Sequence, residues 1–226
     1  MKKNEEIFTQ IYENKDLSWG SNETESGPGS TLSATRHIRK NLEFLLKNLP
    51  IKTLCDIPCG DFHFMDEVEF GKVKYIGCDI VKSLVERNKK KYGNKNREFL
   101  HLDIIDDKFP KSDLVFCKDL FLHISNDNIR KVVNKIRLSD AEFFMSTTEF
   151  LPVIAMPGGK YGKINAPEAN VDVPPENMNG FLAGRPINLF LPPFNFPEAN
   201  FIVGSTEQYP VMALWSTKEL PDFGLT

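Results

Sequence analysis

The chain lacks the features of several large classes of protein. Its formal net charge is only −3, and its one basic run, residues 89–91 with Lys95, is typical of the solvated end of a helix. No stretch approaches the roughly 18 apolar residues of a membrane span, and the charged first residues are not followed by an apolar segment. We therefore expect a soluble, cytoplasmic protein with no nucleic-acid or membrane partner.

Cysteine is also scarce. The four cysteines, at positions 55, 59, 78 and 117, do not form paired C-x-x-C knuckles, which argues against a zinc site and against a disulfide framework. All four fall within or beside strand-like runs. We expect them to be reduced, small, buried residues, and we expect no metal in the protein.

What the sequence does contain is an alternation of short β-rich runs with helical patterns. It predicts an α/β fold, a Rossmann-like doubly wound sheet of seven strands, mostly parallel, with an antiparallel hairpin at one edge. Ser30 is a plausible N-cap for a first helix. The expected helices are 31–49, 61–68, 82–92 and 126–137, and the expected strands are 53–57, 74–79, 97–102, 114–118, 142–147, 200–204 and 211–216.

We expect one domain, residues 1–226, with four parts. Residues 1–33 form a leader that is polar and glycine-rich, and Trp19 suggests that it folds over a cofactor. Residues 34–150 form the cofactor-binding core, and residues 200–226 the edge strands. Residues 151–199 hold nine of the 15 prolines and form an irregular insertion on the substrate side.

Two acids end neighbouring strands of the expected sheet. Asp56 follows the first strand and precedes a Pro-Cys-Gly turn, and Asp79 ends the second strand. Ligands of parallel α/β sheets bind outside the carboxyl ends of the strands, where an acid at the end of the second strand can accept both ribose hydroxyls. A cofactor that contains a nucleoside is therefore implied.

The turn between the two acids separates the candidate cofactors. A dinucleotide fold needs G-x-G-x-x-G after the first strand, because the pyrophosphate must approach the backbone closely. Here only Gly60 remains, and Asp61 places a negative charge where a pyrophosphate would lie. A zwitterionic methionine tail tolerates that charge, so S-adenosylmethionine is favoured and NAD(P) remains the alternative.

With these motifs the sequence resembles the class I S-adenosylmethionine-dependent methyltransferases over about residues 50–150 and the later edge strands. Residues 56–60 look like the first motif, and residues 101–104 and 117–120 like the third and fourth. Pro58 and Phe62 depart from the usual glycines. The Pro-Cys-Gly-Asp turn at residues 58–61, the leader and residues 185–197 together resemble a small bacterial subgroup often associated with surface polysaccharide loci. The resemblance implies cofactor contacts from Trp19, Ser30, Arg36, Asp56, Pro58, Cys59, Gly60, Asp79, Ile80, Asp103, Ile104 and Lys118.

Plainer interpretations stay open for several of these residues. Asp56 and Asp79 could be solvated acids at strand ends, and Asp103 could cap the turn that follows it. Trp19 could be a staple within the leader, and Arg36 could be exposed to solvent.

Methyl transfer to a hydroxyl needs a group that removes the acceptor's proton. Asp119 and His123 lie four residues apart, so they would share a face if the segment after residue 118 were helical. His123 is then the candidate base and Asp119 its orienting carboxylate, although His123 could instead cap the next helix. His63 is a second candidate, and it also counts among the expected substrate-binding residues, with Tyr161, Lys163 and Arg185.

The sequence thus predicts an O-methyltransferase that uses S-adenosylmethionine and releases S-adenosylhomocysteine. The expected acceptor is a hydroxyl, or a phosphoryl-type oxygen, of a small sugar, sugar nucleotide or capsule precursor. An NAD(P)-dependent oxidoreductase and a catalytically silent cofactor-binding module are the alternatives.

Overall fold

The computed structural model describes residues 3–14, 19, 22–149, 153–156, 160–163, 169–172, 184–205 and 208–224. The chain divides into two compact units, Met1–Phe116 and Cys117–Thr226. Seven strands form one sheet in the order β3-β2-β1-β4-β5-β9-β8. Parallel strands make up one part of this sheet and an antiparallel pair lies at its edge, which confirms the predicted fold class.

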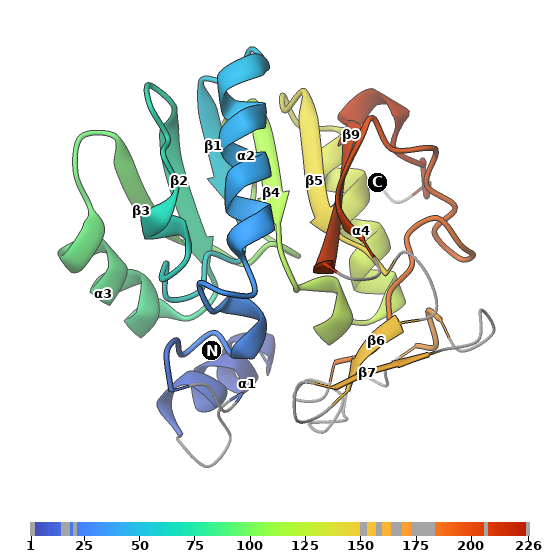
Figure 1. Ribbon diagram of the computed structural model, residues 1–226, viewed down its shortest axis with the longest axis horizontal. Coiled ribbons are helices and arrows are strands. Elements are labelled where there is room, and N and C mark those ends of the chain that lie inside the picture. Colours follow the sequence, from blue (N-terminus) through green and yellow to red (C-terminus); the bar gives the residue numbers. More distant parts are fainter. Residues whose placement is uncertain are drawn as a thin grey trace. The chain divides into compact units, whose positions relative to one another are not determined.

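The first unit contains the parallel strands. β1 (Thr53–Asp56) pairs with β2 (Lys74–Asp79) and with β4 (Leu114–Cys117), and β2 pairs with β3 (Arg97–His101). α3 (Lys82–Tyr92) packs against β2 and β3 and also contacts α1 (Lys3–Glu13). Figure 1 shows α3 beside these two strands, with α1 below it. The carboxyl ends of β1 and β2 therefore lie next to each other, as the sequence predicted.

The helices of this unit form because their apolar residues recur at helical spacing. α2 (Arg36–Asn48) buries Ile38, Leu42, Leu45 and Leu46. It begins later than predicted, with Thr35 as its N-cap, so Ser30 is not an N-cap of this helix. Ser30 instead ends a short 3₁₀ helix, η2 (Pro28–Ser30), and is buried.

The predicted helix at 61–68 is wrong. Only a 3₁₀ turn, η3 (Met65–Glu67), occurs there, because Phe62 takes the left-handed conformation, φ 62°. Its ring is fully buried against Tyr75, Tyr92 and Phe99 with centroids 4.9–5.2 Å away. Aromatic pairs of this kind contribute about 1 kcal/mol each beyond their buried area, so tertiary packing decides the local backbone.

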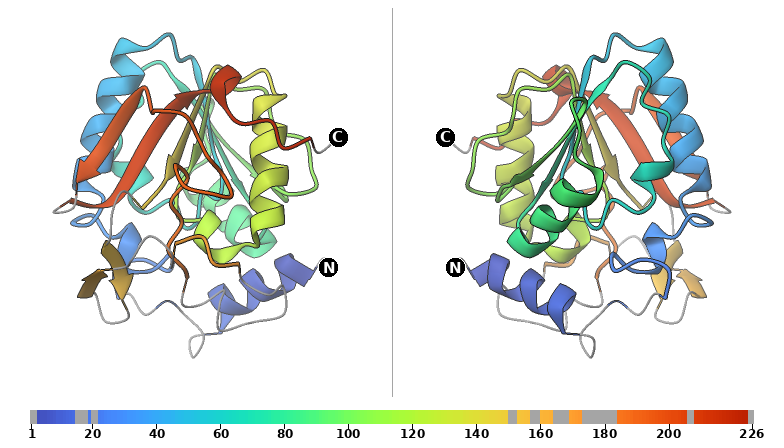
Figure 2. Two further views of the ribbon diagram at one scale, coloured as in Figure 1. Left: turned by 90° about the vertical axis from the view of Figure 1, so that its right-hand side faces the viewer. Right: turned by 90° about the vertical axis from the view of Figure 1, so that its left-hand side faces the viewer.

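The second unit is built around an antiparallel sheet. β5 (Phe143–Thr147) pairs with β9 (Gln208–Ser216), which pairs with β8 (Phe201–Ser205). Figure 2 shows β8 and β9 side by side. The predicted terminal hairpin is thus confirmed, and its second strand is longer than expected. Trp215 of β9 is fully buried and contacts Phe144, Phe190 and Phe196.

This unit also contains three helices and a second pair of antiparallel strands. η4 (Phe121–His123) precedes α4 (Asn126–Arg137), whose N-cap Ser125 accepts a hydrogen bond from the backbone of Asn128. η6 (Thr217–Glu219) follows β9 and contacts α4. β6 (Val153–Met156) and β7 (Lys160–Lys163) form an antiparallel pair within the segment that was predicted to be irregular.

Candidate cofactor site

The turn after β1 is held by hydrogen bonds from both neighbouring elements. The backbone N–H of Gly60 donates to Oδ2 of Asp79 over 3.0 Å, and the carbonyl of Gly60 accepts from Nδ2 of Asn88 over 2.7 Å. The backbone N–H of Cys59 donates to the carbonyl of Cys78. The Ile57–Pro58 peptide bond is cis. The role of Asn88 was not predicted from the sequence. Its position on the apolar face of α3, with Leu84 and Val85, was the available signal.

Asp79 is buried at the end of β2, with 3 % of its surface exposed. Its Oδ1 accepts the backbone N–H of Val81 and its Oδ2 accepts that of Gly60. Burial raises the pKa of this carboxyl to about 6, while the backbone hydrogen bonds oppose the rise. Hydroxyl donors stabilise the charged form of a buried carboxylate, which fits the role expected of Asp79 toward a ribose.

Asp56 is also buried, and Oδ2 of Asp56 accepts the hydroxyl of Tyr75 over 2.6 Å. Burial and the nearby negative charge of Asp56 raise the pKa of the Tyr75 hydroxyl well above its ordinary value. Asp56 and Asp79 are therefore not solvated acids at strand ends. The expected contact of Asp56 with a cofactor stays a prediction.

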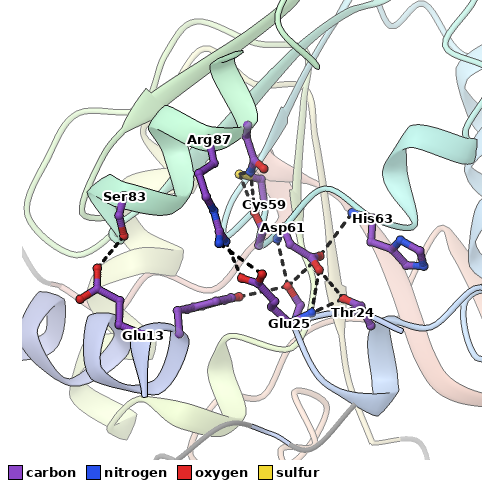
Figure 3. A network of polar contacts seen from close by, with 12 residues as sticks. Glu13, Thr24, Glu25, Cys59, Asp61, His63, Ser83 and Arg87 are labelled. Atoms are coloured by element: carbon purple, nitrogen blue, oxygen red, sulfur yellow. Dashed lines mark hydrogen bonds and ion pairs between the residues drawn. The ribbon is translucent and has the colours of Figure 1, made fainter. Parts of the chain in front are cut away.

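The leader docks on this same turn, as Figure 3 shows. The carboxylate of Asp61 accepts three hydrogen bonds from the leader, from the hydroxyls of Thr24 and Ser26 and from the backbone N–H of Glu25, at 2.7–3.0 Å. Ser26 Oγ in turn accepts the backbone N–H of Asp61. The sequence had treated Asp61 only as a charge that repels pyrophosphate, and nothing in the sequence marked Ser26.

Gly60 is required by this contact. Its φ is +55°, and a Cβ at this position would lie 2.3 Å from Oγ of Ser26 and 3.4 Å from the hydroxyl of Tyr12. The two hydroxyls are 3.1 Å apart. The face of Gly60 that would carry a side chain is therefore covered by Ser26 of the leader and Tyr12 of α1.

Two contacts with α3 fasten the leader at other points. Glu25 forms an ion pair with Arg87, and the carboxylate of Glu13 accepts the hydroxyl of Ser83 over 2.9 Å. Both pairs are visible in Figure 3. Trp19 packs edge-on against Tyr12 of α1, with ring centroids 5.4 Å apart, so the described part of the leader contains the staple that the sequence offered as the plainer interpretation of Trp19.

The remaining predicted cofactor residues of this unit are placed as follows. Oδ1 of Asp103 accepts the backbone N–H of Ile105, so Asp103 does cap the turn after β3. The carbonyl of Ile80 bonds the ring of His101, and Ile104 is buried. Arg36 is exposed at the start of α2. Contacts of these four residues with a cofactor stay predictions.

His63 follows the turn and contacts the leader. Its Nε2 lies 2.9 Å from Oε1 of Glu23, and that oxygen also accepts the backbone N–H of Leu32 over 2.6 Å. These hydrogen bonds hold the pKa of Glu23 below its ordinary value, the one from Leu32 contributing most. No sequence motif pointed to Glu23.

In the second unit, the polar residues after β4 form a separate cluster. Lys118 is buried and forms an ion pair with Oδ2 of Asp119. Oδ1 of Asp119 accepts the hydroxyl of Thr147, and the backbone N–H of Asp119 donates to the same hydroxyl oxygen. Thr147 was not among the predicted residues, and its place at the end of β5 was the available signal.

The predicted pairing of Asp119 with His123 is wrong. Asp119 has a φ of +56°, so the segment after residue 118 does not continue as a helix and the two residues do not share a helical face. Among the residues that the structure describes, the side-chain partners of Asp119 are Lys118 and Thr147. His123 ends η4, where Cε1 of its ring would lie 3.8 Å from a Cβ at Gly184.

Arg185 has a structural role in the same unit. Its guanidinium donates to the carbonyls of Val171 and Ile124 and to Oδ1 of Asn126 at 2.7–2.9 Å. Burial lowers its pKa to about 10. Its use for a substrate stays a prediction. Tyr161 and Lys163 belong to β7, and their side chains lie outside the described part of the structure.

The cysteines are placed as the sequence predicted. All four cysteines are buried free thiols. Burial raises the pKa of Cys59 well above its ordinary value, which keeps it protonated and unreactive. No group of metal ligands occurs among the described residues, and none of the helices described there is long and apolar enough to cross a membrane.

Comparison with known proteins places the fold among methyltransferases. No family model and no curated protein matches the chain. Among solved structures, human N-acetylserotonin methyltransferase in complex with SAM matches 95 % of this chain with 13 % identity and a TM-score of 0.56. The N-methyltransferase NodS from Bradyrhizobium japonicum WM9, in complex with S-adenosylhomocysteine, matches 92 % with 10 % identity and a TM-score of 0.54.

A putative O-methyltransferase from Nostoc punctiforme PCC 73102 matches 80 % of the chain with 12 % identity and a TM-score of 0.52. The match covers 98 % of NodS but only 60 % of the human enzyme and 56 % of the Nostoc protein. At this level of identity the similarity is one of fold. Function has to be argued from the site.

Proposed function

We propose that this chain is a methyltransferase that uses S-adenosylmethionine and acts on an oxygen of a small sugar, a sugar nucleotide or a related capsule precursor. The observation that carries the proposal is the buried carboxylate of Asp79. It ends β2, it is joined by a hydrogen bond to the Gly60 turn, and its pKa is raised to about 6. Further hydroxyl donors would stabilise its charged form, and a ribose offers two.

The fold supports the same conclusion. The solved methyltransferases named above share it, and two of them were crystallised with SAM or S-adenosylhomocysteine. In this chain Asp79 would hold the ribose and the Gly60 turn the methionine end. When bound, S-adenosylmethionine supplies a methyl group on a positively charged sulfur. The chain's own residues then have to orient the acceptor, exclude water and accept its proton.

The acceptor is the less constrained part of the proposal. An oxygen acceptor, either a hydroxyl or a phosphoryl-type oxygen, follows from the resemblance to the subgroup at surface polysaccharide loci. His123 remains a candidate base of the second unit, without the help of Asp119.

The test is a screen of sugar nucleotides and phosphorylated sugars with a methyl-labelled donor. We expect label to enter at least one acceptor, and we expect no labelling with Asp79→Ala. The matched control is Asp66→Ala, which removes a half-exposed acid that pairs with Arg97 on the surface of the same unit. A chain that binds S-adenosylhomocysteine but labels no acceptor would be a silent binding module, and a chain that binds NAD instead would be an oxidoreductase.

A further inference from the structure

A histidine and a carboxylate form a pair beside the cofactor turn that the sequence did not predict. His63 lies three residues after Gly60, and its backbone N–H donates to Oδ1 of Asp61 over 3.3 Å. Its Nε2 lies 2.9 Å from Glu23 Oε1, and about 29 % of the His63 side chain is exposed. The backbone of His63 is thus held by Asp61 and its ring by Glu23, and the ring is still open to a ligand or to water.

The pair has the arrangement of a general base. In the tautomer whose Nε2–H donates a hydrogen bond to Glu23, Nδ1 carries no proton and keeps its lone pair. Over the part of the chain that the structure describes, His63 bonds only the carboxylates of Glu23 and Asp61, the latter through its backbone. A carboxylate behind an imidazole fixes the tautomer and raises the basicity of the other nitrogen.

The charges around His63 and Glu23 favour the tautomer in which the His63 Nε2–H donates to Glu23. Hydrogen bonds from Leu32 and His63 lower the pKa of Glu23, so this carboxylate is ionised throughout the range in which histidine titrates. Two other charged groups lie close by. Arg39 of α2 also lowers the pKa of Glu23, and Asp61 lies on the turn itself.

The two members of the pair come from different segments. His63 belongs to the turn, whereas Glu23 belongs to the leader. The three residues that follow Glu23 are the ones that dock on Asp61, through the hydroxyls of Thr24 and Ser26 and the backbone of Glu25. Undocking of the leader would therefore remove the carboxylate from His63.

We propose that His63, oriented by Glu23, is the general base of the methyl transfer, and that docking of the leader assembles it. The proposal rests on the proposed function. As the bond between the acceptor oxygen and the methyl carbon forms and the bond between that carbon and sulfur breaks, the hydroxyl proton moves to Nδ1 of His63. S-adenosylhomocysteine is the leaving group, and the imidazolium returns its proton to solvent through the exposed edge of the ring.

The first test is nitrogen NMR of the histidine side chains in the whole chain, which needs no acceptor. We expect the Nε2–H tautomer for neutral His63 in the wild type, and a larger share of the Nδ1–H tautomer in Glu23→Gln, because a neutral amide accepts a weaker hydrogen bond than a carboxylate. Glu86→Gln, an exposed position on α3, is the matched control and should leave the tautomer populations unchanged. An Nδ1–H tautomer in the wild type, or the same tautomer populations in Glu23→Gln, would overturn the proposal.

The second test is turnover of the acceptor that the wild type labels in the screen. His63→Gln should lower kcat by about 10² to 10⁴ and change the Kd for S-adenosylhomocysteine less than about twofold, whereas His37→Gln on α2 should change neither. Glu23→Gln should move the acidic limb of the pH–rate profile, which a purely structural contact would not do. If His63→Gln keeps more than half of kcat, the proposal that His63 is the base is refuted and the proposed function still stands. If the wild type does not bind S-adenosylhomocysteine, the proposed function is refuted as well.

Discussion

The backbone N–H of Gly60 donates a 3.0 Å hydrogen bond to the carboxylate of Asp79. This bond joins the turn after β1 to the end of β2, and Asp61, the next residue, receives the leader. A chain of direct contacts therefore connects Asp79 to the leader. Changes at any of these residues should affect both the binding of the cofactor and the docking of the leader.

Replacement of Gly60 by alanine tests the close contact with the leader. Gly60 and Gly71 have nearly the same left-handed backbone, φ +55° and +58°, but a Cβ at Gly71 would meet nothing within 4 Å. Both alanine variants pay the strain of a positive φ, about 1 kcal/mol. We expect Gly60→Ala to lower the free energy of unfolding by about 2 kcal/mol more than Gly71→Ala, measured by urea denaturation.

Ser26→Gly removes the hydroxyl that the new methyl group would meet. It should therefore recover part of the difference when it is combined with Gly60→Ala. Equal losses in Gly60→Ala and Gly71→Ala would mean that the leader does not rest on the turn.

The raised pKa of Asp79 makes stability depend on pH. Because its folded-state pKa is about 6 and its ordinary value is 3.8, the folded state favours the protonated form. Its stabilising contribution is present below pH 4 and is lost as the pH rises through 6. Relative to Asp79→Asn, the wild type should lose roughly 2 kcal/mol between pH 4 and pH 7, measured by denaturation across this range.

Asp79 should also make the affinity for S-adenosylhomocysteine depend on pH, and this affinity should rise with pH whereas the stability falls. Ribose hydroxyls donate to the ionised carboxylate, so the affinity for S-adenosylhomocysteine should rise about tenfold from pH 5 to pH 7. Asp79→Asn should bind weakly and show no such rise. An affinity that is the same at both pH values would contradict a ribose contact by Asp79.

Asp61 should control whether the leader is docked. Asp61→Ala removes the acceptor of three hydrogen bonds from residues 24–26, which contribute roughly 1 kcal/mol each. We expect hydrogen exchange of the leader amides to accelerate at least about tenfold while β1 and β2 keep their protection. The control Asp66→Ala breaks only a surface ion pair with Arg97 and should leave the leader amides protected from exchange. If the leader amides stay protected in Asp61→Ala as well, Asp61 does not hold the leader.

Asn170 is the corresponding anchor in the second unit. It is buried with a φ of +62°, its Nδ2 donates to the carbonyls of Asn188 and Pro192, and its Oδ1 accepts the backbone N–H of Asn188. Asn170→Ala should cost about 3 kcal/mol of unfolding free energy. Asn195→Ala, at an exposed residue with a φ of 49°, should cost about 1 kcal/mol or less, and a similar cost for both would exclude the anchoring role.

The alternation of strand and helix patterns predicted the strands of both units up to β5. β1 to β5 all lie within one residue of their predicted ends, because buried parallel strands are short apolar runs bounded by turns. Asp56 and Asp79 were identified for the same reason, since both end such a run. A local pattern is sufficient for these elements.

Features that depend on contacts between distant residues were missed or mistaken. Nothing near Phe62 in the sequence indicates that its ring packs against Tyr75, Tyr92 and Phe99 and so stops the predicted helix. The partners of Asp61 and His63 lie 35 to 40 residues earlier in the chain. The conformation of Asp119 depends on Thr147 of another strand, so helical spacing gave the wrong partner for His123.

The measurement that tests the central claim most directly is calorimetry of S-adenosylhomocysteine and of NAD at pH 7.5, with the wild type and with Asp79→Ala. The account predicts micromolar binding of S-adenosylhomocysteine to the wild type, at least a hundredfold loss with Asp79→Ala, and no binding of NAD. Binding of NAD in place of S-adenosylhomocysteine, or equal affinity of both variants for S-adenosylhomocysteine, would contradict it.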